Sequence, residues 1–176
     1  MPLTQLARDA NRIKELCDLL EFLADDLPRR SPAVWREARR LSAKVLPRHF
    51  RVLTECLLPI LARDAESDVF EAATLARIRD ECDTCNACLS ELSDLLEQSH
   101  EFPCASMSPE TVGYALRGFF TDIRRQIAWE QNLLLPLASQ RCDDLDIYAL
   151  RDCLLSTPKP ARAEIPLLCA AKRYIF

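Results

Sequence analysis

The segment RQIAWEQNLLLPLA (residues 125–138) has an earlier counterpart in RHFRVLTECLLPIL (residues 48–61). Both contain Leu-Leu-Pro, so Pro136 can be aligned with Pro59. Their apolar residues recur at alternating spacings of three and four, which is the pattern of a helix that buries one face. The chain therefore carries two related helical segments, and an α-helical protein is the first expectation.

The inward-facing polar positions of the two segments differ. With the prolines aligned, Gln126 falls opposite His49 and Glu130 falls opposite Leu53. At the first of these positions both residues are polar but of different types. At the second position only one segment has a polar residue. These four positions, four residues apart within each segment, lie on one face of a helix. They are the natural place to look for a binding site.

The composition supports an all-α domain. The chain has 176 residues but only two glycines, and a chain so poor in glycine is better suited to long helices than to a turn-rich sheet. One domain of this length can bury a sizeable core. The net charge of −4 is spread along the chain. Because no basic stripe is present to follow phosphates, nucleic acid is not an expected partner.

The N-terminal residues MPLTQLARDANRIKEL are charged throughout and lack the apolar core of a signal peptide. No run approaches the roughly 20 apolar residues of a membrane-spanning helix, so we expect a cytoplasmic protein that does not bind membranes. The nine cysteines are an odd number and cannot all pair within one chain. We therefore expect thiols, either buried or reactive.

Four segments show helical periodicity, and their connections are mostly short, which favours an up-down-up-down four-helix bundle. A short fifth helix follows at about residues 139–155. We assign residues 1–155 to the bundle and residues 156–176 to a proline-containing C-terminal tail that docks on the bundle or on a partner. The four predicted helices cover residues 4–26, 31–62, 67–97 and 108–138.

The same periodicity predicts which residues face inward. In the second helix, Pro47 should cause a kink or a split. Beyond it, the spacing places His49 and Leu53 on the inward line, and this line continues through Cys56 and Ile60. The inward positions in the last predicted turns of the fourth helix are Leu133 and Leu137. In the third helix they include Cys82 and Cys85.

The paired segments resemble the hemerythrin-like (HHE cation-binding) family. The resemblance covers roughly residues 5–155 and is carried most specifically by the two Leu-Leu-Pro sequences. It implies a four-helix bundle around a di-iron centre. In that family the second and fourth helices supply His-x-x-x-Glu before Leu-Phe-Pro or Leu-Leu-Pro. The first and third helices each supply an acidic residue followed by histidine.

Most of the ligands implied by this resemblance are absent. Ala10 and Cys82 stand at the histidine positions of the first and third helices, after Asp9 and Glu81. The second helix keeps its histidine but loses its carboxylate, and the fourth helix does the reverse. The resemblance thus implies a degenerate metal site. Its candidate ligands are His49, Cys82, Gln126 and Glu130.

Two interpretations of this polar cluster remain open. A buried Glu130 needs a partner, and either His49 or Gln126 can supply one, which gives a hydrogen-bonded core. Alternatively, His49, Cys82 and Glu130 bind a metal, with Cys85 or water as the fourth ligand. That set of ligand types suits zinc.

The cysteine string ECDTCNACLS offers a further pair of alternatives. On a helix, Cys82, Cys85 and Cys88 lie on consecutive turns of nearly one face. They either pack as small apolar residues or act as redox thiols. For the redox case, the alternative resolving thiols nearer predicted loops or helix ends are Cys104, Cys142 and Cys153.

No Ser-His-Asp set, glycine-rich phosphate loop or paired-carboxylate motif occurs in the chain, so we expect no catalytic residues and no enzyme activity. The expected function is that of a binding or sensing scaffold without a cofactor, acting through a protein partner or self-association. The alternative is an iron- or zinc-binding protein that senses oxygen, nitric oxide or redox state.

Overall fold

The computed structural model describes residues 1–27, 31–65, 68–98 and 107–156. In these residues every regular element is helical and no strand occurs, so the predicted all-α class is confirmed. The elements in chain order are α1 (Pro2–Asp25), α2 (Pro32–Lys44), α3 (Leu46–Val52), η1 (Leu53–Leu57), α4 (Leu58–Asp64), α5 (Val69–Ala87), α6 (Leu89–Gln98), α7 (Pro109–Trp129), η3 (Glu130–Leu134), α8 (Leu135–Arg141) and α9 (Asp144–Leu155).

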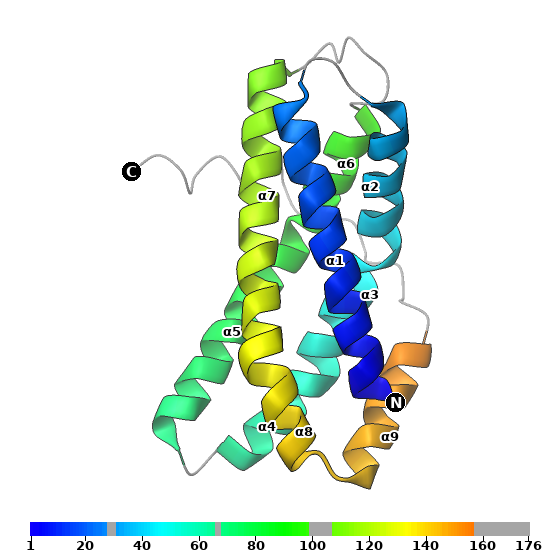
Figure 1. Cartoon of the computed structure of the whole chain (residues 1–176). Helices are drawn as coiled ribbons and strands as arrows, with labels where there is room; N and C mark the ends of the chain where they lie inside the picture. Colours follow the sequence, from blue (N-terminus) through cyan, green and yellow to red (C-terminus); the bar gives the residue numbers. More distant parts are fainter. Residues whose placement is uncertain (28–30, 66–67, 99–106, 157–176) are drawn as a thin grey trace.

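The helices form the predicted up-down-up-down bundle (Figure 1). Helix α1 runs upward in that view, α2 to α4 run downward, α5 and α6 run upward, and α7 and α8 run downward. Helix α1 packs on α2 and α7, while α5 and α6 close the square by packing on α7 and α2. The two related segments of the sequence therefore run in the same direction. Among the described helices, none is both long and apolar enough to cross a membrane.

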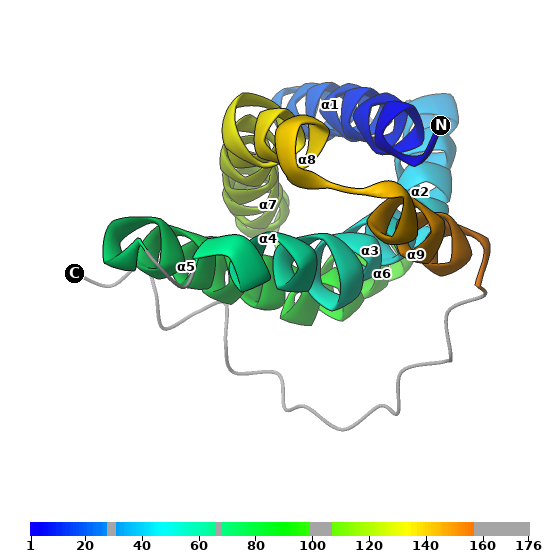
Figure 2. The same ribbon diagram turned by 90° about the horizontal axis from the view of Figure 1, so that it is seen from below.

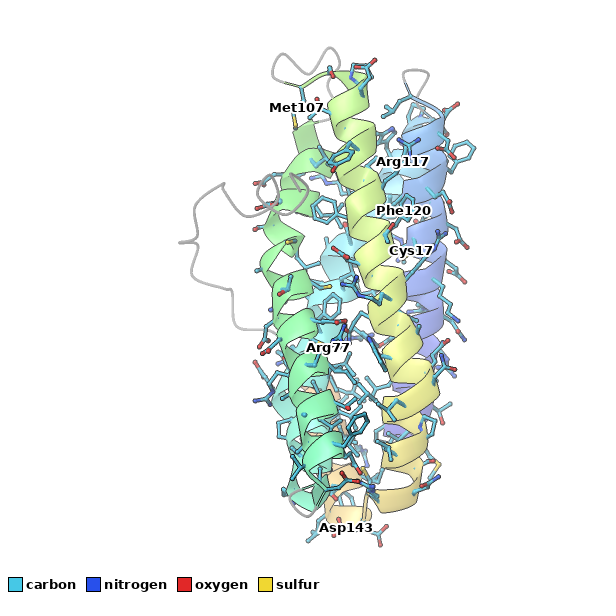
Figure 3. All side chains as sticks on the ribbon, turned by 90° about the vertical axis from the view of Figure 1, so that its left-hand side faces the viewer. Cys17, Arg77, Met107, Arg117, Phe120 and Asp143 are labelled. Atoms are coloured by element: carbon cyan, nitrogen blue, oxygen red, sulfur yellow. The ribbon has the colours of Figure 1, made fainter. Side chains whose placement is uncertain are left out.

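The fifth helix, α9, lies at the lower end of the bundle beside the start of α1 and against α3 (Figures 1 and 2). It begins in the turn marked by Asp143 in Figure 3, where a reciprocal capping box joins Asp143 and Asp146. Arg63 of α4 forms an ion pair with Asp146 and ties the start of α9 to the bundle. The predicted docking of the tail concerns residues 157–176, which lie outside the described residues.

Two helix interruptions differ in how well the sequence predicted them. The break before Pro47 is confirmed, since α2 ends at Lys44 and α3 starts at Leu46. The third predicted helix is split at Cys88, which its periodicity did not indicate. There the Cys88 N–H is shared between the carbonyl oxygens of Thr84 at 3.3 Å and Cys85 at 3.2 Å.

Both related segments contain a π-helical turn just before their proline. In η1 the Leu58 N–H donates to the carbonyl of Leu53, and after η3 the Leu135 N–H donates to the carbonyl of Glu130. Proline has no N–H and clashes with the carbonyl four residues earlier, so a widened turn ahead of it relieves that crowding. Such turns carry one extra residue and are frequent at functional sites.

The π turns change which side chains face the core. Leu57 and Leu134 are fully buried, whereas the predicted inward residues Cys56, Leu133 and Leu137 are only partly buried. For these three residues the prediction was wrong. An extra residue in the turn makes the inward spacing four throughout, so the buried line continues to the fully buried residues Leu61 and Ala138.

The long interface between α1 and α7 combines apolar packing with arginine pairs. Cys17 and Phe120 lie in this interface (Figure 3), and both are buried. Arg124 donates to Asp18 at 2.8 Å and to Glu21 at 2.6 Å, and its guanidinium stacks 4.9 Å from the centre of the Phe120 ring. These contacts fix the register of α7 against α1 and so the depth of the residues that follow on α7.

Candidate functional site

A histidine and a carboxylate meet inside the bundle. His49 belongs to α3 and Glu130 begins η3, and Nε2 of His49 lies 2.7 Å from Oε2 of Glu130. Both side chains are completely buried. The sequence left His49 or Gln126 as the partner of a buried Glu130, and the structure pairs it with His49.

The pair leaves other buried polar atoms unpaired. Oε1 of Glu130 and Nδ1 of His49 have no hydrogen-bond partner, and the same holds for the amide oxygen and nitrogen of Gln126. An unpartnered buried polar group costs about 1–3 kcal/mol of stability. The centre of the bundle is therefore more polar than its packing requires.

Cys82 of α5 is the fourth candidate ligand, and it lies against Gln126. Its side chain is fully buried, and burial, followed by the neighbouring Cys85, raises the pKa of the thiol well above its usual range. The nearby Glu130 carboxylate acts in the same direction. The structure thus brings His49, Gln126 and Glu130 together with a thiol that resists ionisation.

The remaining positions implied by the resemblance carry apolar side chains. Ala10 and Leu53 are both fully buried and offer no donor atom. What remains is one imidazole, one carboxylate, one amide and one protonated thiol. Two iron ions need several imidazoles and enough carboxylates to offset their charge, so this set does not fit a di-iron centre. Within the described parts of the chain, no three His, Cys, Asp or Glu residues are gathered closely enough to hold a metal ion.

A second buried carboxylate was missed as a site residue. Asp9 of α1 is completely buried and accepts from Arg48 at 2.6 Å and from Gln5 at 2.9 Å. Arg48 directly precedes His49, and Asp9 directly precedes Ala10. The ion pair therefore joins α1 to α3 beside the polar centre. The sequence could have pointed to Asp9, because it directly precedes Ala10 on the inward-facing line of its helix.

The three predicted redox thiols occupy different environments. Cys82 and Cys85 are buried, while Cys88 is partly exposed at the break between α5 and α6. Burial is the main cause that raises the pKa of Cys85 to about 12. Low-pKa, accessible thiols are the ones that react readily. Neither buried thiol has that character. Cys104 lies outside the described residues.

A comparison with protein-family models matches the hemerythrin HHE cation binding domain over residues 1–138. No curated protein and no solved structure matches the chain. The matched region ends three residues before the end of α8 and so includes both π turns and the His49–Glu130 pair, but not α9.

Proposed function

The chain belongs to the hemerythrin HHE cation-binding family, and we propose that it is a non-enzymatic member that acts as a binding or sensing scaffold. The observation that carries this proposal is the direct hydrogen bond between His49 and Glu130. In the family motif the histidine nitrogen and the carboxylate oxygen are metal ligands. Here these atoms of His49 and Glu130 are hydrogen-bonded to each other instead. The bundle is then stabilised by a pair of side chains in the place where relatives are expected to hold ions.

The residues around the pair support the same proposal. Ala10 and Leu53 give the site apolar walls, and Gln126 is at best a weak ligand. Loss of a single ligand weakens a metal site, but here four of the positions are changed. A scaffold role requires only that the bundle fold, and its buried apolar residues form one core cluster.

We propose that the scaffold acts in the cytoplasm on a protein partner or a second copy of itself, with α9 as the contact surface. Leu145, Tyr148 and Leu155 lie on the outer face of this helix and are 76%, 62% and 73% exposed. Contiguous exposed apolar side chains are typical of protein contacts. Light scattering of the full-length protein and of Tyr148→Glu separates the two possibilities. If the chain self-associates, the variant should have a lower molecular mass than the wild type. If the chain binds another protein, the two masses should be equal.

Metal analysis of the purified full-length protein tests the scaffold proposal. The protein is expressed in medium supplemented with iron and zinc, and its metal content and visible spectrum are recorded. We expect less than one tenth of an ion per chain and no visible band. One or two irons per chain, or an oxo-bridge charge-transfer band, would overturn the scaffold proposal.

The alternative is a metal-binding member that senses oxygen, nitric oxide or redox state through iron or zinc. The unpartnered atoms of Glu130, His49 and Gln126 favour it, because a bound ion would satisfy some of them. One zinc per chain that is lost in both Cys82→Ala and Glu130→Gln would support this alternative. Equal zinc content in these variants and the wild type would place the ion elsewhere.

A further inference from the structure

Two cysteines that are far apart in the sequence lie close together between η1 and α9, at the edge of the hydrophobic core. Cys56 of η1 and Cys153 of α9 lie close enough for Cys153 to raise the pKa of the Cys56 thiol, and the two elements that carry them pack against each other. Cys153 is 9% exposed, and Cys56 is partly exposed. In the sequence Cys56 belonged to the inward line of its helix and Cys153 was only one of several alternative thiols, so neither pointed to the other.

The π turn explains how the two thiols meet. Because η1 carries an extra residue, Leu57 takes the fully buried position and Cys56 turns away from the central line. Helix α9 packs against α3 and η1 on that side. The extra residue in η1, which changes the buried residues of this helix, therefore also places the Cys56 thiol against α9.

Arg51 holds the end of α9 over this turn. Its guanidinium donates to the carbonyl oxygen of Cys153 at 2.9 Å and to that of Ser156 at 2.6 Å. A further bond of 3.1 Å reaches the Ser156 hydroxyl. Arg51 lies one turn before Cys56 on the same side of the helix. This side therefore contacts Cys153 twice, through Arg51 at its backbone and through Cys56 near its thiol. The thiol contact is part of an ordered junction between two elements.

We propose that Cys56 and Cys153 form an oxidative modification site, at which a hydroperoxide converts the dithiol into a disulfide that ties α9 to η1. The site shares no residue with the polar centre of the bundle and does not depend on whether that centre binds a metal. Its product would hold α9, the helix with the exposed apolar face, in the position it has in the reduced protein.

The chemistry is balanced with the hydroperoxide as the only oxidant. The Cys56 thiolate attacks the outer peroxide oxygen, the O–O bond breaks, and the alkoxide or hydroxide that leaves takes up the thiol proton. Cys56 is then a sulfenic acid. The Cys153 sulfur attacks the Cys56 sulfur, the S–O bond breaks, and water leaves with the Cys153 proton. Two electrons pass from the two thiols to the peroxide.

The environment of Cys56 predicts how the rate depends on pH. Burial and the contact with Cys153 raise the pKa of Cys56 to about 12. Only the thiolate attacks a peroxide, so this raised pKa makes Cys56, like Cys85, a slow thiol near neutral pH, and the rate should rise about tenfold for each pH unit below that pKa. Cys56 is the first thiol to react because it is partly exposed, whereas Cys153 is buried.

The test uses the reduced full-length protein, hydrogen peroxide, and trapping of remaining thiols by iodoacetamide before proteolysis and mass spectrometry. We expect a linked peptide pair that contains Cys56 and Cys153, with at least fivefold faster formation at pH 9 than at pH 8. A non-reducing gel should show a single-chain species. The absence of this linked pair while other thiols oxidise, or a link between chains, would overturn the proposal.

Single substitutions provide the controls. In Cys56→Ala we expect no linked pair and an unmodified Cys153, while Cys17→Ala should give the wild-type linked pair. Circular dichroism before oxidation shows that each variant is folded. A wild-type rate of Cys153 oxidation in Cys56→Ala would show that Cys153 reacts by itself, and the proposed order of steps would be wrong.

Discussion

Nε2 of His49 lies 2.7 Å from Oε2 of Glu130, although 81 positions separate the two residues in the chain. Each is the surviving half of a His-x-x-x-Glu motif, one on α3 and one at the start of η3. The two incomplete motifs therefore combine across the bundle into one complete pair. The geometry explains why both residues remain buried and polar in a core from which the other expected ligands have been lost.

This pair should be strongly coupled in folding stability. Removing one member of a buried pair leaves the other unpaired, so Glu130→Leu and His49→Leu should each cost about 3 kcal/mol of unfolding free energy. The double variant should cost less than their sum by at least about 1 kcal/mol, because two apolar side chains need no partner. Urea unfolding measures the three values.

The exposed Glu55→Leu serves as the matched control for this cycle, with an expected change within about 0.5 kcal/mol. If the two core substitutions were simply additive, the hydrogen bond between them would contribute nothing to stability. The conclusion that they form one structural unit would then be wrong.

The loss of Arg48 should cost more folding stability than the loss of the charge on Asp9. Asp9 is completely buried, whereas the Arg48 side chain is 33% exposed. Arg48→Ala strands a buried carboxylate with only Gln5 as donor, and we expect a loss of about 3 kcal/mol. Asp9→Asn should cost clearly less, since Arg48 still reaches water. Thermal and urea unfolding test this order.

Arg8→Ala is the control for the ion pair, because Arg8 is exposed on the same helix as Asp9 and makes only a long contact of 3.4 Å with Gln5. Its cost should stay below about 0.5 kcal/mol. Equal losses for Arg48→Ala and Arg8→Ala would show that the buried carboxylate is satisfied without Arg48.

Alkaline pH should destabilise the bundle through its buried thiols. Burial raises the pKa of Cys17 and of Cys85 from 9.0 to about 12, and that of Cys82 is also raised. Above pH 9 the unfolded chain loses these protons while the folded chain keeps them. The stabilising contribution is thus complete below pH 9 and is lost progressively as the pH rises toward 12.

Each such thiol should remove about 1 kcal/mol of stability between pH 8 and pH 10. Urea unfolding of the reduced protein at both values measures the loss, which should be smaller in Cys17→Ala. The exposed Ser90→Ala should keep the wild-type loss. Stability that is unchanged from pH 8 to pH 10 would mean that the thiols ionise equally well in the folded protein.

Restoring the implied ligands should restore iron binding. Four substitutions together recreate the ligand motif of the hemerythrin family: Ala10→His, Leu53→Glu, Cys82→His and Gln126→His. We expect iron in the purified quadruple variant and none in the wild type, measured by elemental analysis. A folded quadruple variant that takes up no iron would show that these four positions do not face a common centre.

The sequence by itself determined the helical class and the order of the bundle. Alternating spacings of three and four need only local geometry, and Ala10 and Leu53 exclude metal ligation whatever surrounds them. The two Leu-Leu-Pro segments also sufficed to place His49 and Glu130 at related positions. These conclusions depend on side-chain chemistry and on the period of one helix, both of which can be read directly from residue types.

Only the tertiary structure decided the contacts that depend on register between elements. A single extra residue in each π turn moved Leu57 into the core and turned Cys56 toward α9, and no periodic pattern predicts where a helix widens. The distance from His49 to Glu130 and the ion pair of Asp9 with Arg48 likewise depend on how neighbouring helices slide against each other. Packing of whole helices sets that position, so it is absent from any one segment of sequence.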